Sequence, residues 1–139
     1  MKKSTIVVAV LGAFLVVTLI VGYIIVYSKG EDSYNLIRSI GPISKVEITY
    51  GGAQGEMITI SDRAILDSLN VTLDNLGNSI RVNIAKANDV YAFIVVYKRG
   101  KSGSMEVVHS QYTGWVLIVG NYKFKNDYVF GLVQRYLPK

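Results

Sequence analysis

Residues Ile6–Tyr27 read IVVAVLGAFLVVTLIVGYIIVY, an apolar run of 22 residues without a charged side chain. As a helix that rises about 1.5 Å per residue, this run extends about 33 Å and can cross a hydrocarbon core of about 30 Å. The alternative is a cleaved signal peptide, whose apolar region usually spans about 7–15 residues and ends in a small-x-small site. The best such site, Val26-Tyr27-Ser28, is poor because of its valine. We therefore expect an uncleaved signal anchor in the membrane.

The charges beside the apolar run predict its orientation. Lys2 and Lys3 precede the run, whereas Lys29 is followed by two acidic residues. Because basic residues favour the cytoplasmic side, we expect the N-terminus in the cytoplasm and the bulk of the chain outside the cell membrane. The residues after the run could form a short helix of their own or continue the helix that leaves the membrane. The chain then divides into a stub and anchor (1–28), a juxtamembrane connector (29–44) and an extracytoplasmic domain (45–139).

The composition excludes several classes of function. The chain has no cysteine, which excludes a disulfide scaffold, a thiol enzyme and a zinc-thiolate site. Three of its 15 basic residues flank the apolar run, so the other basic residues exceed the 10 acidic ones by only two. No basic run is longer than two residues. We expect no nucleic-acid binding, because that requires several cations that converge on one surface.

The chain beyond residue 44 has the pattern of an α+β domain. Val46, Ile48 and Tyr50 alternate with polar residues, as in a strand with one buried face. The run Val90–Tyr97 is apolar on both faces, as in a central strand. Ser61 and Asn126 are positioned to cap helices. We expect an antiparallel sheet of about five to six strands with two helices packed on one face. The expected strands cover 45–50, 57–60, 80–85, 90–97, 105–112 and 115–124.

Two junctions between expected strands and helices carry a resemblance. The segment Ile58–Asp62 leads from a strand into a helix, and Gly120–Phe124 leads through a last strand into the terminal helix. Together they resemble small membrane-anchored or secreted domains of unknown function from Gram-positive bacteria, over the stretch from Lys45 to Leu137. This resemblance implies the same fold and location. It implies no activity, because that group has none assigned.

Motifs for catalysis and for metal or cofactor binding are weak. Gly100-Lys101-Ser102 lacks the earlier glycine of a phosphate-binding loop and precedes an expected strand instead of a helix. His109 is the sole histidine, and its neighbours Glu106 and Ser110 would point to the opposite face of a strand. We therefore expect no catalytic residue, cofactor or metal. The alternative is a small cell-envelope enzyme in which the fold brings a carboxylate close to His109.

Aromatic residues on the expected strands, together with a glycine-rich hairpin, indicate a recognition surface. Tyrosine is favoured at such surfaces because its ring is large and its hydroxyl forms hydrogen bonds. We expect a non-catalytic binding or accessory module that recruits or occludes a protein or envelope partner. An immunity-type protein that blocks an incoming toxin is a further alternative. The candidate partner surface comprises Tyr91, Tyr97, Tyr112, Tyr122, Gly52 and Gln54.

Overall fold

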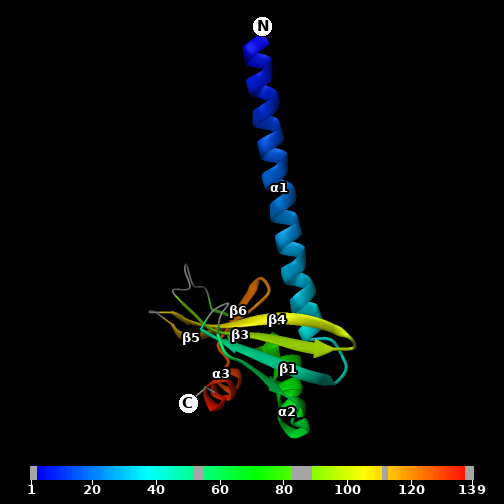
Figure 1. Ribbon diagram of the computed structural model, residues 1–139, viewed down its shortest axis with the longest axis vertical. Helices are drawn as coiled ribbons and strands as arrows, with labels where there is room; N and C mark the ends of the chain where they lie inside the picture. The colour runs from blue at the N-terminus through cyan, green and yellow to red at the C-terminus, as the bar shows by residue number, and fades with distance from the viewer. Residues whose placement is uncertain (1–2, 52–54, 83–88, 111–112, 137–139) are drawn as a thin grey trace.

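The computed structural model describes residues 3–51, 55–82, 89–110 and 113–136. Within these residues it contains three α-helices, a short 3-10 helix at Leu76–Asn78 and six strands. Figure 1 shows the first helix as a straight rod whose lower end meets the folded domain. The elements in chain order are α1 (Lys3–Ile37), β1 (Ile43–Tyr50), β2 (Met57–Ile60), α2 (Arg63–Asp74), β3 (Asp89–Lys98), β4 (Lys101–Ser110), β5 (Gly114–Val119), β6 (Tyr122–Phe124) and α3 (Asp127–Arg135).

The strands form one antiparallel sheet in the order β2-β1-β3-β4-β5-β6. Strand β3 lies in the middle and pairs with β1 on one side and β4 on the other. The connection from β2 to β3 runs through α2, and the later strands follow one another as neighbours. The predicted α+β class with an antiparallel sheet is confirmed.

One face of the sheet carries the core. Residues that are paired across strands lie on the same face of a sheet. On the covered face, one row of paired residues crosses five strands, and every residue in that row is buried. Against it lie α2, through Leu66, Leu69 and Leu73, and α3, whose Val133 carbonyl accepts a 2.6 Å hydrogen bond from the Tyr50 hydroxyl. Helix packing on one face is therefore as expected. The residues that trace this face are Tyr50, Ala92, Val107, Leu117 and Phe124.

The last turns of α1 add a third helical contribution to the same face. Tyr34 and Ile37 are buried in the core cluster that includes the residues of α2 and α3. The helix crosses β4 at Gly103, where an added Cβ would lie 3.1 Å from the Ile37 side chain. Helix α1 is continuous from the apolar run to this contact. Of the two alternatives for the connector, the helix that continues is the one formed, as far as Ile37.

Three expected strands differ from the structure. Strand β4 begins at Lys101, four residues before the expected start at 105. Ile80 is 70% exposed, Arg81 makes a single bridge to Phe124, and residues 83–85 of the expected strand lie outside the described residues. The expected strand over 115–124 is two strands, because the chain turns at Gly120 and β6 folds back on β5. Gly120 has φ +57°, a left-handed conformation that glycine adopts without a Cβ clash. Periodicity did not reveal this turn because apolar residues continue on both sides of it.

Candidate functional site

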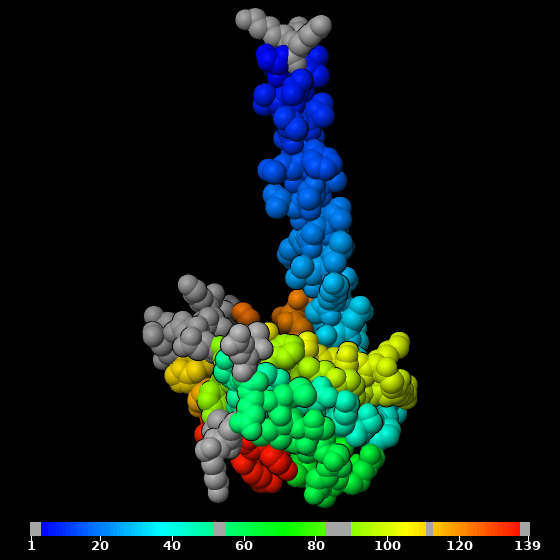
Figure 2. All heavy atoms as spheres, in the orientation of Figure 1, coloured from blue at the N-terminus to red at the C-terminus, as the bar shows by residue number. Residues whose placement is uncertain are grey.

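Helix α1 has two halves with different surroundings. It is long and apolar enough to cross a membrane, and none of its apolar window is buried within the structure. Phe14 and Leu19, for example, are 72% and 65% exposed. Figure 2 shows this half standing free of the domain, which gathers around the lower end of the helix. By length and composition this half of α1 is a candidate membrane span, and a signal sequence near the N-terminus has the same properties.

The hairpin between β5 and β6 is attached to α1 where the apolar run ends. The Asn121 side-chain amide donates a 2.9 Å hydrogen bond to the Tyr27 carbonyl oxygen. A Cβ added at Gly120 would collide with the Gly30 carbonyl oxygen, so the two backbones touch. Only glycine at position 120 permits both the close approach and the left-handed turn. The contacts between α1 and the folded domain therefore begin at Tyr27 and Gly30.

A buried lysine fastens the end of α1 to the sheet. The Lys98 side chain is 0% exposed, and its ammonium donates hydrogen bonds to the carbonyl oxygens of Ile37 (2.7 Å) and Ser39 (3.0 Å). Asp74 of α2 lies 3.6 Å from the same ammonium. Burial lowers the pKa of Lys98, although the nearby Asp74 carboxylate acts in the opposite direction. Lysine is rarely buried, and here the carbonyl groups at the end of the helix compensate for its lost hydration.

Stacked rings and cations reinforce this junction. The rings of Tyr34 and Tyr122 lie 4.3 Å apart, and Arg38 and Arg81 each lie over one of them, at 5.1 and 4.9 Å. Arg38 also donates a 2.9 Å hydrogen bond to the Tyr34 hydroxyl. A hydrogen bond to the Glu31 carboxylate raises the pKa of Tyr122. Tyr122 thus packs against α1.

The opposite face of the sheet holds a small buried cluster around Val108 and Val116. Over β1 and β3 this face is open and carries a polar cluster. Glu47 lies 2.7 Å from the Lys45 ammonium through one oxygen and accepts a 2.7 Å hydrogen bond from the Tyr97 hydroxyl through the other. The Lys45 ammonium also lies 4.3 Å from the centroid of the Tyr97 ring. The hydrogen bond from Lys45, followed by that from Tyr97, lowers the pKa of Glu47. This carboxylate is stabilised as an anion and is poorly suited to act as a general base.

Apolar side chains flank the polar cluster on the open face. Phe93 is 39% exposed on β3, and Met57 is 59% exposed on β2. Phe93 belongs to this face because its ladder partners are Thr49 and Glu106, which alternate with the buried residues of their strands. Phe93 and Met57 are both paired with Thr49, whereas Tyr97 is paired with Lys45, and Glu47 lies between these two rows of the sheet. Aromatic residues and methionine are enriched at protein interfaces. We call Lys45, Glu47, Met57, Phe93 and Tyr97 the open-face patch.

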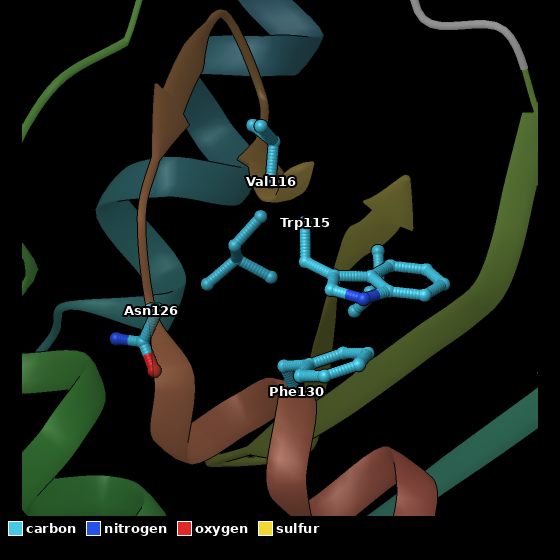
Figure 3. Close-up of a pocket in the computed structure, with 6 residues that line it drawn as sticks. Trp115, Val116, Asn126 and Phe130 are labelled. Carbon is cyan, nitrogen blue, oxygen red and sulfur yellow. The ribbon is translucent and has the colours of Figure 1, made fainter. Parts of the chain in front are cut away.

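A second aromatic group lies between the sheet and α3. Tyr91 occupies a bulge in β3, and its ring lies 4.7 Å from that of Trp115. Trp115 stacks on Phe130 of α3 at 4.3 Å, as Figure 3 shows. The crevice beside these rings has no room for a water molecule. Tyr91 therefore contributes to packing at this end of the sheet.

The histidine lies at the rim of this aromatic group. Its ring contacts the edge of Trp115 at 4.9 Å, and the residue is exposed. Asp89 is the residue paired with His109 in the β3–β4 ladder. Glu106 lies on the other face, where it pairs with Phe93. Among the described residues, no group of three or more histidine, cysteine, aspartate or glutamate side chains could hold a metal ion.

The structure distributes the candidate partner residues over several places. Tyr97 lies on the open face, Tyr91 packs on Trp115, and Tyr122 packs on Tyr34. Gly52, Gln54 and Tyr112 lie outside the described residues. Sequence reasoning missed Lys98, for which the available signal was a lysine at the end of an otherwise apolar central strand. Alternation placed Lys45 and Glu47 together on the polar face of their strand, but it did not indicate that Tyr97 of the neighbouring strand donates a hydrogen bond to Glu47.

No family model, no curated protein and no solved structure matches this chain. Its function is therefore inferred from the geometry alone.

Proposed function

We propose that this protein is a single-pass membrane protein whose domain lies outside the cytoplasm and acts as a non-catalytic binding module. Helix α1 is the anchor, with its N-terminus in the cytoplasm. The open-face patch recruits or occludes a protein or envelope partner. The observation that carries this proposal is the division of α1 into a bare apolar half and a half buried in the domain core.

The bare half of α1 favours a lipid environment on energetic grounds. Each leucine- or valine-sized side chain gains about 1.5–3 kcal/mol when it leaves water, and the apolar run holds many such residues in succession. The buried half makes release of the domain unfavourable. Detaching α1 would expose Tyr34 and Ile37 and leave the Lys98 ammonium without the two carbonyl groups that accept its hydrogen bonds.

The arrangement of the sheet favours a partner that approaches from the side. In Figure 1, β4, β3 and β1 lie one below another with increasing distance from the free end of α1. This part of the sheet therefore stands along the helix direction. If α1 spans the membrane, the open face points sideways, parallel to the plane of the membrane. A partner anchored in the same membrane, or one bound beside it, has direct access.

The open-face patch has features that favour binding. The Tyr97 ring is held by Glu47 at its hydroxyl and by Lys45 at its face, so little side-chain entropy remains to be lost when a partner binds. Phe93 and Met57 offer apolar area that a partner could remove from water. Aromatic anchors of this kind carry much of the binding energy in protein interfaces.

Site-specific photo-crosslinking in the native cells tests the proposal. A photoreactive amino acid at Phe93 should capture one partner in stoichiometric amounts. The same group at Val71, which is 62% exposed on α2, should not. Equal capture from both positions, or none from Phe93, would reject the open face as the binding surface.

Carbonate extraction of the same membranes tests the anchor separately. The full-length chain should remain in the membrane fraction. Recovery of a soluble fragment that begins near Lys29 would show a cleaved signal sequence and contradict the anchoring role of α1.

A further inference from the structure

A polar groove lies between α1 and the β3–β4 hairpin, and its lining residue Ser102 is paired with Tyr97 of the open-face patch. It is a half-open depression with a volume of about 590 Å³. The α1 wall supplies carboxylate, hydroxyl and amide groups, and the hairpin wall supplies two cationic side chains. The lining residues used below are Asp32, Ser33 and Asn35 on α1 and Arg99, Lys101 and Ser102 on the hairpin.

The arginine in this groove occupies an unusual backbone position. Arg99 has φ +52°, and within the described residues it is the single non-glycine residue with positive φ. Arg99 and Gly100 are the two central residues of a tight hairpin turn between the paired Lys98 and Lys101. Turns with two positive φ angles favour asparagine, aspartate and glycine. A long side chain kept at such a position against its backbone preference suggests a role for that side chain.

The fold also leaves room for the Arg99 side chain. Its Nε lies 3.0 Å from the point that a Cβ on Gly41 would occupy, so the guanidinium stem passes over the bare backbone of this glycine. In the described part of the chain, neither Arg99 nor Lys101 forms an ion pair. The hairpin wall therefore presents two uncompensated positive charges to the groove. Ser33 and Ser102 also line the groove.

We propose that this groove binds a phosphate-bearing ligand. The Arg99 guanidinium offers the planar fork that suits phosphate oxygens, and Lys101 supplies a second charge. Ser33, Ser102 and Asn35 can donate further hydrogen bonds. Asp32 repels an anion at its own end of the groove, so the phosphate lies at the hairpin end. An amine or a neutral polyol group then lies towards Asp32.

The position of the groove makes a lipid headgroup one source of this phosphate. Asp32 follows Tyr27 by five residues, which is about 7.5 Å along a helix. The groove therefore begins about one headgroup layer beyond the end of the apolar run. A soluble phosphate ester from the surroundings is the other source. Both present the same chemistry to Arg99.

The decisive variant is Arg99→Asn, because asparagine suits the left-handed turn and removes the charge. Full-length protein in phosphatidylcholine nanodiscs is titrated with glycerol 3-phosphate by calorimetry. In a second arm, nanodiscs that also contain phosphatidylglycerol are used, and native mass spectrometry measures the lipid retained by the released protein. Arg135→Gln, at an exposed position on α3, is the matched loss of charge elsewhere.

We expect the wild-type protein and Arg135→Gln to bind at least one probe, and Arg99→Asn to bind it about tenfold more weakly. The melting temperature of Arg99→Asn should equal or exceed that of the wild type, which separates lost binding from lost folding. Binding of glycerol 3-phosphate identifies a soluble ligand, whereas retention of phosphatidylglycerol alone identifies the headgroup. Absence of both, or equal weakening by Arg99→Asn and Arg135→Gln, overturns the proposal.

Discussion

The buried ammonium of Lys98 lies 2.7 Å from the carbonyl oxygen of Ile37 and donates a hydrogen bond to it. This contact joins the end of the central strand β3 to the last turn of α1, where helix carbonyl groups lack partners within the helix. A second hydrogen bond to Ser39 extends the attachment past the end of the helix. Helix α1 and the sheet are therefore held together by polar contacts as well as by the packing of Tyr34 and Ile37.

Replacement of Lys98 by methionine should destabilise the domain by about 1–3 kcal/mol. Methionine fills the space of the lysine stem but leaves two carbonyl oxygens without donors, and a buried unsatisfied group costs about this much. Chemical unfolding in detergent micelles measures the change. Lys125→Met, at an exposed position, is the control and should change stability by less than about 0.5 kcal/mol. Equal stability of both variants would show that the Lys98 contacts contribute nothing.

Replacement of Gly120 by alanine should detach the β5–β6 hairpin from α1. Alanine meets two obstacles there, the left-handed φ of +57° and the Gly30 carbonyl oxygen. Gly114 is the matched control, because it has φ +72° but open space around an added Cβ.

Gly114→Ala should therefore cost about 1 kcal/mol from backbone strain alone. Gly120→Ala should cost clearly more, and amide hydrogen exchange in β5 and β6 should accelerate. If both variants lose the same stability, the contact between Gly120 and Gly30 is not tight.

Unfolding at alkaline pH should report on Tyr50. Burial, and to a lesser degree Tyr91, raises the pKa of Tyr50 from 10.0 to about 12. Between these values the unfolded chain loses the phenol proton while the folded chain keeps it, so stability is full below pH 10.0 and falls as the pH rises towards about 12. The loss attributable to Tyr50 is about 2–3 kcal/mol.

Tyr50→Phe provides the comparison for this titration. It removes the hydrogen bond to Val133 and should lower stability at neutral pH by about 1 kcal/mol. Its stability should then decline less steeply over the alkaline range. Parallel stability curves for the two proteins from about pH 9 to about pH 12 would contradict a raised pKa.

Partner capture should depend on Tyr97 and not on His109. Tyr97→Ala removes the ring and hydroxyl that Lys45 and Glu47 hold in place on the open face, and we expect capture by the Phe93 cross-linker to fall by about tenfold or more. His109→Ala removes a ring at the rim of the Trp115 group and should leave capture unchanged. Loss of biological function in His109→Ala, with normal folding, would favour the enzyme alternative instead.

Local patterns predicted much of the fold. Alternation in β1 and the two-sided apolar run in β3 indicated the sheet, and the Asn126 cap is formed, with its side chain accepting a hydrogen bond from the Val129 amide. The expected Ser61 cap was wrong, because Asp62 is the residue whose side chain accepts the hydrogen bonds at the start of α2. The candidate site was less predictable. A tyrosine on a strand suits both a core and a binding surface, since its ring is apolar and its hydroxyl polar. The structure placed Tyr97 on the open face but packed Tyr91 and Tyr122 against other rings.

The sequence by itself determined the apolar helix, the antiparallel sheet and the buried face of β1, because these depend on periodicity and composition within short windows. Tertiary structure alone decided that α1 continues into the core, that Lys98 binds the end of α1, and that Arg99 faces α1 across a groove. These relationships join residues far apart in the chain. Their energies depend on distance and burial in three dimensions, which no local pattern of residue types specifies.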